Sequence, residues 1–167
     1  MLIQQKIGNL NSYPVNAKTI DWLALHWFET NKRIQRKRTV AGQEVALKFL
    51  HENPSLTQGD VLFETETTIV AVNILPCECL IIAPKYMFEM ARICYEIGNK
   101  HLALFYENEE LLIPFEQPLY KLLTAQGCEV KQGQRKLLQP LTTTVSPHGS
   151  NGGTLFSKIM KLTTTNE

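Results

Sequence analysis

Residues 91–101 have the sequence ARICYEIGNKH, in which an amphipathic helix is expected to end just before a histidine. Gly98 and Asn99 predict that end, because both residue types tolerate the left-handed backbone that closes a helix. His101 follows and opens a predicted strand over residues 102–106. A side chain at such a junction is fixed at its base and free at its tip, which suits a metal ligand or a catalytic base. The alternative is a half-exposed histidine that only begins a strand. The apolar residues expected on the core-facing side of the helix are Met87, Met90, Ala91, Cys94 and Ile97.

The elements predicted around this helix follow the order β-α-β-β-α-β over residues 76–140. This order is typical of the ferredoxin-like fold, a fold that hosts many functions. The predicted elements are a strand at 80–82, a helix opened by Pro84, strands at 102–106 and 111–115 on either side of an acidic turn at 107–110, a helix between Pro118 and Gly127, and a strand within 129–138.

Residues 1–75 predict an all-β domain, a small sandwich or barrel. Strand-forming residues occupy 21–28, and Gly42 marks a hairpin turn because glycine permits a positive φ. Pro76 interrupts the strand pattern, so we place the domain limit there. The predicted fold class is therefore α+β, with an N-terminal all-β domain followed by the ferredoxin-like domain.

The last part of the chain, residues 141–167, predicts a flexible tail, because its first half is rich in turn residues and has almost nothing to bury. Residues 155–162 are more apolar and are expected to form a short segment that docks on the folded body.

Composition and charge exclude several classes of function. Hydrophobic residues make up 44% of the 167 positions and charged residues 20%, as in an ordinary globular protein. The formal net charge of +1 gives no electrostatic argument for a nucleic-acid or membrane partner. No apolar run approaches the roughly 20 residues of a membrane span, and the N-terminus lacks the apolar centre of a signal peptide. We therefore expect a cytoplasmic protein.

Catalytic and RNA-binding motifs are missing from the sequence. It has no Ser-His-Asp grouping and no phosphate-binding glycine loop between a strand and a helix, so we expect no enzyme. The β-α-β-β-α-β order also describes the RNA-recognition module, but that module needs stacking aromatics on its central strands. The strands predicted at 80–82 and 111–114 carry none.

Four cysteines are too few for a disulfide framework in a chain of this length. Cys94 and Cys128 are predicted to be buried small hydrophobes. Cys77 and Cys79 lie two positions apart, so in a strand both thiols face the same side and can present a soft metal site. A thiol-based copper or zinc carrier is therefore the alternative function.

The segment YEIGNKH, residues 95–101, resembles the signature of the urease accessory nickel chaperones, the UreE family. The Gly42 hairpin and the Gly-Asp-Val-Leu sequence at 59–62 are similar to that family's N-terminal, peptide-binding-like domain. The resemblance implies that His101 binds nickel at the centre of a homodimer and that a tail histidine, here His148, joins the site. It also implies a non-enzymatic metallochaperone that delivers Ni(II) during urease maturation, with the accessory GTPase and the urease maturation complex as partners.

Two departures from the family pattern limit what the resemblance implies. Lys100 stands where arginine is commoner; it keeps the charge but loses the planar guanidinium fork, so we assign it no ligand role. The tail has no histidine-rich run, which leaves one site per dimer rather than storage of many ions. Zn(II) and Cu(II) also suit imidazole nitrogen. His26 and His51 are interpreted as ordinary histidines of the β domain.

Overall fold

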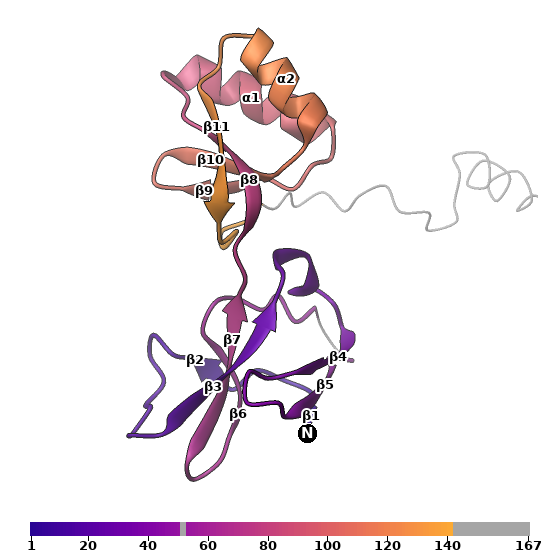
Figure 1. The fold of residues 1–167 in the computed structure, drawn as a ribbon, viewed down its shortest axis with the longest axis vertical. Helices are drawn as coiled ribbons and strands as arrows, with labels where there is room; N and C mark the ends of the chain where they lie inside the picture. The colour runs from indigo at the N-terminus through magenta and orange to yellow at the C-terminus, as the bar shows by residue number, and fades with distance from the viewer. Residues whose placement is uncertain (51–52, 142–167) are drawn as a thin grey trace, which may run out of the picture.

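The computed structural model describes residues 1–50 and 53–141, arranged as two units that lie one above the other along the long axis of the molecule (Figure 1). The architecture confirms the predicted α+β class: strands alone build the sheets of the N-terminal unit, and both α-helices belong to the C-terminal unit. His51, His148 and residues 155–162 lie outside the described residues, as does all of the predicted tail except Leu141.

The N-terminal unit packs a three-stranded sheet against a four-stranded sheet. Inward side chains from both sheets form its core, including Leu23, Leu47 and Val72. Gly42 has φ +89° in the turn between two strands, as the sequence predicts. The strands of the first sheet, in order, are β1 (Leu2–Ile3), β5 (Glu44–Lys48) and β4 (Ile34–Arg38); those of the second are β2 (Gly8–Asn9), β6 (Asp60–Glu64), β7 (Thr68–Ile74) and β3 (Thr19–Leu25).

The strand expected over residues 21–28 ends earlier, at Leu25, and a short 3₁₀ helix, η1 (Trp27–Glu29), follows it. Glu29 explains the turn: its carboxylate accepts hydrogen bonds from the His26 backbone N–H at 3.0 Å and from Lys37 Nζ at 2.6 Å. Burial raises the pKa of Glu29, but these hydrogen bonds outweigh it and hold the pKa below its usual value. Satisfying this buried carboxylate bends the chain at a place where propensity alone favours a strand.

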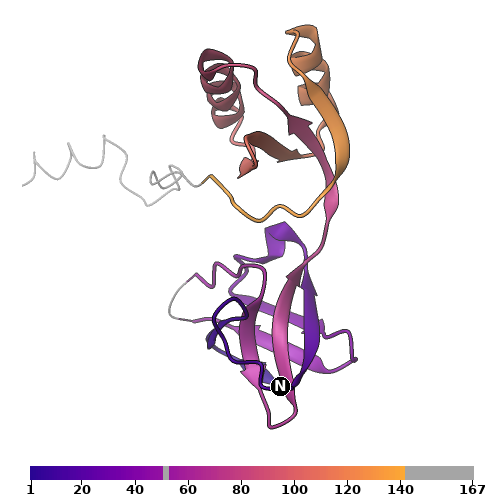
Figure 2. The same ribbon diagram turned by 90° about the vertical axis from the view of Figure 1, so that its left-hand side faces the viewer.

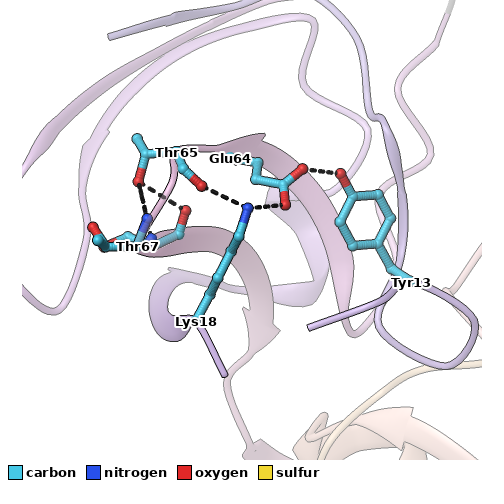
Figure 3. Close-up of polar contacts among 6 residues, drawn as sticks. Tyr13, Lys18, Glu64, Thr65 and Thr67 are labelled. Atoms are coloured by element: carbon cyan, nitrogen blue, oxygen red, sulfur yellow. Dashed lines mark hydrogen bonds and ion pairs between the residues drawn. The ribbon is translucent and has the colours of Figure 1, made fainter. Parts of the chain in front are cut away.

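Figure 3 shows the polar contacts at the β6–β7 hairpin, which Figure 1 places at the end of the N-terminal unit away from the C-terminal unit. The Glu64 carboxylate accepts hydrogen bonds from Lys18 Nζ and from the Tyr13 hydroxyl, and Lys18 Nζ also donates to the Thr65 carbonyl at 2.8 Å. The Lys18 ammonium, and after it the Tyr13 hydroxyl, lower the pKa of Glu64. The cluster ties the loop before β3 to the β6–β7 turn.

The C-terminal unit is an antiparallel sheet in the order β11-β8-β10-β9 with two helices on one face (Figures 1 and 2). Consecutive residues of β8 alternate between its faces, so Leu80 and Ile82 face the helices while Cys79 and Ile81 face the other side. The elements are β8 (Cys77–Ile82), α1 (Met87–Asn99), β9 (Phe105–Glu107), β10 (Glu110–Pro114), α2 (Gln117–Ala125) and β11 (Val130–Arg135). This is the predicted ferredoxin-like order.

Helix α1 differs from its prediction at its start. It begins at Met87 rather than in the turn opened by Pro84. The Glu89 carboxylate accepts a hydrogen bond from the Lys85 backbone N–H at 2.7 Å, which holds the chain in a turn before the helix. The core-facing residues are also shifted. Ile93 and Ile97 are buried, whereas Met87 and Ala91, expected to face the core, are exposed. Apolar residues cover more than half of this helix's circumference, so spacing alone did not select the correct face.

Residues 75 and 76 connect β7 to β8, and we propose that the limit between the two domains lies there. In the described part of the chain, no helix is long and apolar enough to cross a membrane.

Candidate metal centre

His101 is the first residue after the end of α1 in a left-handed conformation, with φ +53°. Gly98, which the sequence marks as the helix stop, has no positive φ, and the helix continues through it to Asn99. The prediction, which placed the left-handed residue at Gly98 or Asn99, was therefore wrong by two or three residues. The reason is packing: Leu102 and Ile97 both belong to the core beneath the helix end, and bringing them together requires the chain to reverse at His101.

The hydrogen bonds around His101 form a Schellman motif. The His101 N–H donates to the Gly98 carbonyl at 3.0 Å, and the Leu102 N–H donates to the Ile97 carbonyl at 3.4 Å. This pair of bonds defines the motif, whose left-handed position is usually glycine. A residue with a Cβ is strained there by roughly 1–2 kcal/mol. Two hydrogen bonds and the packing of Leu102 against the core therefore hold the backbone of His101 in a conformation that favours glycine.

The side chain of His101 is exposed, and so are its neighbours Gly98, Asn99 and Lys100. Within residues 1–50 and 53–141, no group of three or more histidine, cysteine or acidic side chains is close enough to hold a metal ion. The described residues therefore place the His101 imidazole on a fixed backbone without bringing other metal-ligating side chains close to it.

An exposed apolar stripe runs along α1 on the side away from the core. It consists of Phe88, Ala91 and Tyr95, spaced three and four residues apart, and the side chains of Phe88 and Tyr95 are 74% and 70% exposed. The stripe continues toward Gly98 and the helix end that carries His101. Sequence reasoning missed this surface, although a second apolar line at helical spacing, opposite Ile93 and Ile97, was the signal for it.

The other histidines do not join His101. His26 lies in the N-terminal unit, where its ring stacks on Phe28 with the planes 2° apart and the centroids 5.3 Å apart. His51 and His148 lie outside the described residues, so the predicted partnership of His148 with His101 is not tested by the structure.

The two cysteines of the alternative site lie where the sequence predicts, on one face of β8. Their environment does not favour metal binding. Burial raises the pKa of the Cys77 thiol, and burial followed by the neighbouring Cys77 raises the pKa of Cys79 to about 11. The Cys79 thiol also donates a hydrogen bond to the Gly133 carbonyl at 3.3 Å. Metals bind the thiolate, and this face of the sheet favours the protonated form.

The remaining cysteines lie on the helical side of the sheet. Cys128 is buried, as predicted, and its sulfur is 3.4 Å from a guanidinium nitrogen of Arg92. Cys94 is only half-buried, at the edge of the core. Burial is the main cause that raises the pKa of both thiols.

A small ferredoxin-like unit with an exposed histidine at a helix end, joined to a unit of two β-sheets, defines an α+β protein of two units. Comparison with models of known families identifies the protein family. Models of the N-terminal and C-terminal domains of the UreE urease accessory protein match residues 3–75 and 78–151. The chain belongs to the UreE family.

Individual relatives agree with this assignment over most of their length. The chain is 42% identical over 163 residues to the urease accessory protein UreE of Flavobacterium johnsoniae, which covers 97% of this chain and 99% of the relative. It is 41% identical over 153 residues to the UreE of Helicobacter pylori strain G27, covering 89% of each chain. It is 38% identical over 144 residues to the UreE of Haemophilus influenzae strain PittGG, and the match covers 84% of this chain and 78% of the relative. The protein therefore has an accessory, metal-related role in urease maturation.

Proposed function

We propose that this protein is a nickel metallochaperone that binds Ni(II) through His101 at the two-fold axis of a homodimer and delivers it during assembly of the urease active site. The observation that carries the proposal is the position of His101: its backbone is fixed in the Schellman turn and its imidazole is exposed at the end of the apolar stripe. Imidazole nitrogen suits Ni(II), and also Zn(II) and Cu(II).

A homodimer supplies what a single chain lacks. A residue on a two-fold axis occurs twice, so two copies of His101 converge on one ion. The stripe of Phe88, Ala91 and Tyr95 is a fitting contact surface, because exposed aromatic side chains are typical of the centres of interfaces. Dimerisation through this stripe would bring the two ends of α1 near the axis.

His148 from one or both chains completes the ligand set in this proposal. A site of this kind is open and partly built from a tail, which allows the ion to be released as well as held. We further propose that the protein acts in the cytoplasm, without catalysis of its own, and that the accessory GTPase of urease maturation receives the metal from it. The N-terminal unit would serve as the peptide-binding module of that assembly.

The test is calorimetric nickel titration of the wild type, His101→Ala and the control His26→Ala, with the molecular mass measured in the same solutions. We expect one ion per dimer in the wild type and in His26→Ala. Binding at the axis should be lost in His101→Ala, which should remain a dimer. Unchanged binding in His101→Ala would contradict the proposal, and loss of binding after blocking Cys77 and Cys79 would favour the thiol carrier.

The dimer surface is tested separately. Tyr95→Asp places a charge in the stripe, so we expect a monomer with weakened nickel binding. Val40→Asp is the control, because Val40 is an equally exposed apolar residue of the N-terminal unit, and this variant should remain dimeric. A dimeric Tyr95→Asp protein would exclude this face of α1 as the interface.

A further inference from the structure

An apolar groove with a volume of about 440 Å³ lies between the two units. Residues of η1, the loop before β6 and the end of β7 form one wall, and the segment after α1 and the last described residues form the other. Figure 2 shows the chain after β11 passing through this junction. The large apolar side chains that line the groove include Trp27, Phe28, Leu102, Leu104, Leu138 and Leu141.

The groove is held open by contacts between the units. The Trp27 ring packs edge-on against Phe105, with centroids 5.6 Å apart, and Lys136 Nζ donates a hydrogen bond to the Asn73 side chain at 2.7 Å. Even so, the groove leaves apolar surface in water, because Phe28 is 53% exposed and Leu141 is 52% exposed. Surface of this kind between domains is typical of a binding site.

The C-terminal part of the same chain fits this groove. Residues 155–162 have the sequence LFSKIMKL, in which Leu155, Ile159 and Leu162 recur at helical spacing, Phe156 and Met160 widen the same face, and both lysines lie off it. The described chain ends in the groove wall, where the Leu141 N–H donates to the Leu104 carbonyl at 2.8 Å. We propose that residues 155–162 dock in this groove with their apolar face toward Phe28 and Leu141.

Residues 155–162 are favoured over a second copy or a partner protein as the occupant of the groove, because they are covalently attached to its wall. Residues 142–154 are the only connection between the segment and the groove wall, and a short tether gives an effective concentration on the order of millimolar. The loop also costs little to close, because closure entropy grows slowly with loop length. The same segment of a second copy is present only at the solution concentration of the protein, so it would have to compete with the higher effective concentration of the attached segment.

Docking has a consequence for the metal site, and this step rests on the proposed function. It closes residues 142–154 into a loop anchored at both ends, with His148 midway between Leu141 and Leu155. Seven residues span at most about 25 Å, and Leu102 in the groove wall is the neighbour of His101. The docked segment would anchor this loop at both ends and so restrict the space that the His148 side chain can sample, whereas in a free tail the loop is anchored only at Leu141.

Hydrogen exchange of the full-length protein in the presence of a chelator tests docking without involving nickel. The variants are Ile159→Asp, which puts a charge on the apolar face, and Ser157→Asp, which puts the same charge off that face. Phe28→Asp tests the groove wall, with Ile34→Asp as an exposed control on β4. Exchange of the β7 amides verifies the fold of each variant.

We expect the amides of residues 102–105 to exchange at least about tenfold faster in Ile159→Asp and Phe28→Asp than in the wild type and both controls, which corresponds to a segment docked about 90% of the time. Equal rates in the wild type and Ile159→Asp would overturn the proposal. Protection that disappears on tenfold dilution would also overturn it and indicate a second copy. If hydrogen exchange confirms docking but His101→Ala binds nickel as the wild type does, the proposed function is wrong and the docking proposal is unaffected.

Discussion

Replacing His101 by glycine should stabilise the fold while removing the imidazole proposed to bind nickel. The residue lies at the left-handed position of a Schellman motif, with φ +53°. Glycine has no Cβ and adopts this conformation without a steric penalty. Alanine has the same Cβ as histidine and keeps the penalty, so His101→Ala and His101→Gly form a matched pair that both lack the imidazole.

The size of the effect follows from two opposing terms. Relieving the left-handed strain contributes about 1–2 kcal/mol. Glycine also gives the unfolded chain more freedom than alanine, which costs about 0.4–1 kcal/mol. The net expectation is that His101→Gly is more stable than His101→Ala by about 1 kcal/mol, or about 2–4 °C in Tm for a chain of this size.

Thermal and urea unfolding of the wild type and both variants, in a chelator, measure this difference, and nickel titrations of the same samples measure the loss of the ligand. Stability and metal affinity should change in opposite directions in His101→Gly. If this variant is less stable than His101→Ala, the backbone at residue 101 is not left-handed in solution. If it is less stable than the wild type, the imidazole makes a stabilising contact. Either outcome refutes the reasoning.

Three further predictions concern pH and thiol chemistry. Because Glu64 has a pKa below its ordinary value of 4.5, its stabilising contribution is complete above that value and is lost as the pH falls through the lowered pKa; Glu64→Gln should be less stable at pH 7 and show a flatter acid dependence in urea unfolding. With a pKa of about 11, Cys79 carries about a hundredth of the thiolate of an ordinary thiol near pH 7.5, so mass spectrometry should find it labelled slowly by iodoacetamide, with or without nickel. Imidazole binds metals only when neutral, so nickel affinity measured by calorimetry should fall on acidification in the wild type.

Local signals predicted most of the fold. Gly42 and Gly127 have the positive φ that their turns require, and Pro118 lies in the first turn of α2. The acidic turn between β9 and β10 was also predicted, and it places Asn108 and Glu109 at φ values of +50° and +66°, the conformation of a tight hairpin. Each of these features depends on a few neighbouring residues, and a single sequence contains that information.

The features that sequence reasoning missed depend on contacts between distant residues. Glu29 turns the chain after β3 because Lys37 approaches it from another strand. The left-handed residue that follows α1 is His101 rather than Gly98 or Asn99, because Leu102 packs against the core that contains Ile97. The candidate site also depends on distant parts. His101 was proposed from a local motif, whereas the further ligands of the proposed site would come from a second chain and from the tail.

The left-handed conformation of His101 separates two explanations for a histidine at this position. If only the turn mattered, glycine would serve it better by about 1 kcal/mol, and the backbone hydrogen bonds to Gly98 and Ile97 would be unchanged. Nothing in the described structure uses the imidazole to hold the fold, because the side chain is exposed. His26 is the contrast, since its ring stacks on Phe28. Left-handed backbone also occurs at Ala17 and Glu109, so the strain alone does not mark a ligand. Together with the exposed imidazole, it supports the proposal that His101 acts on something outside the single folded chain, as a metal ligand shared between two chains would.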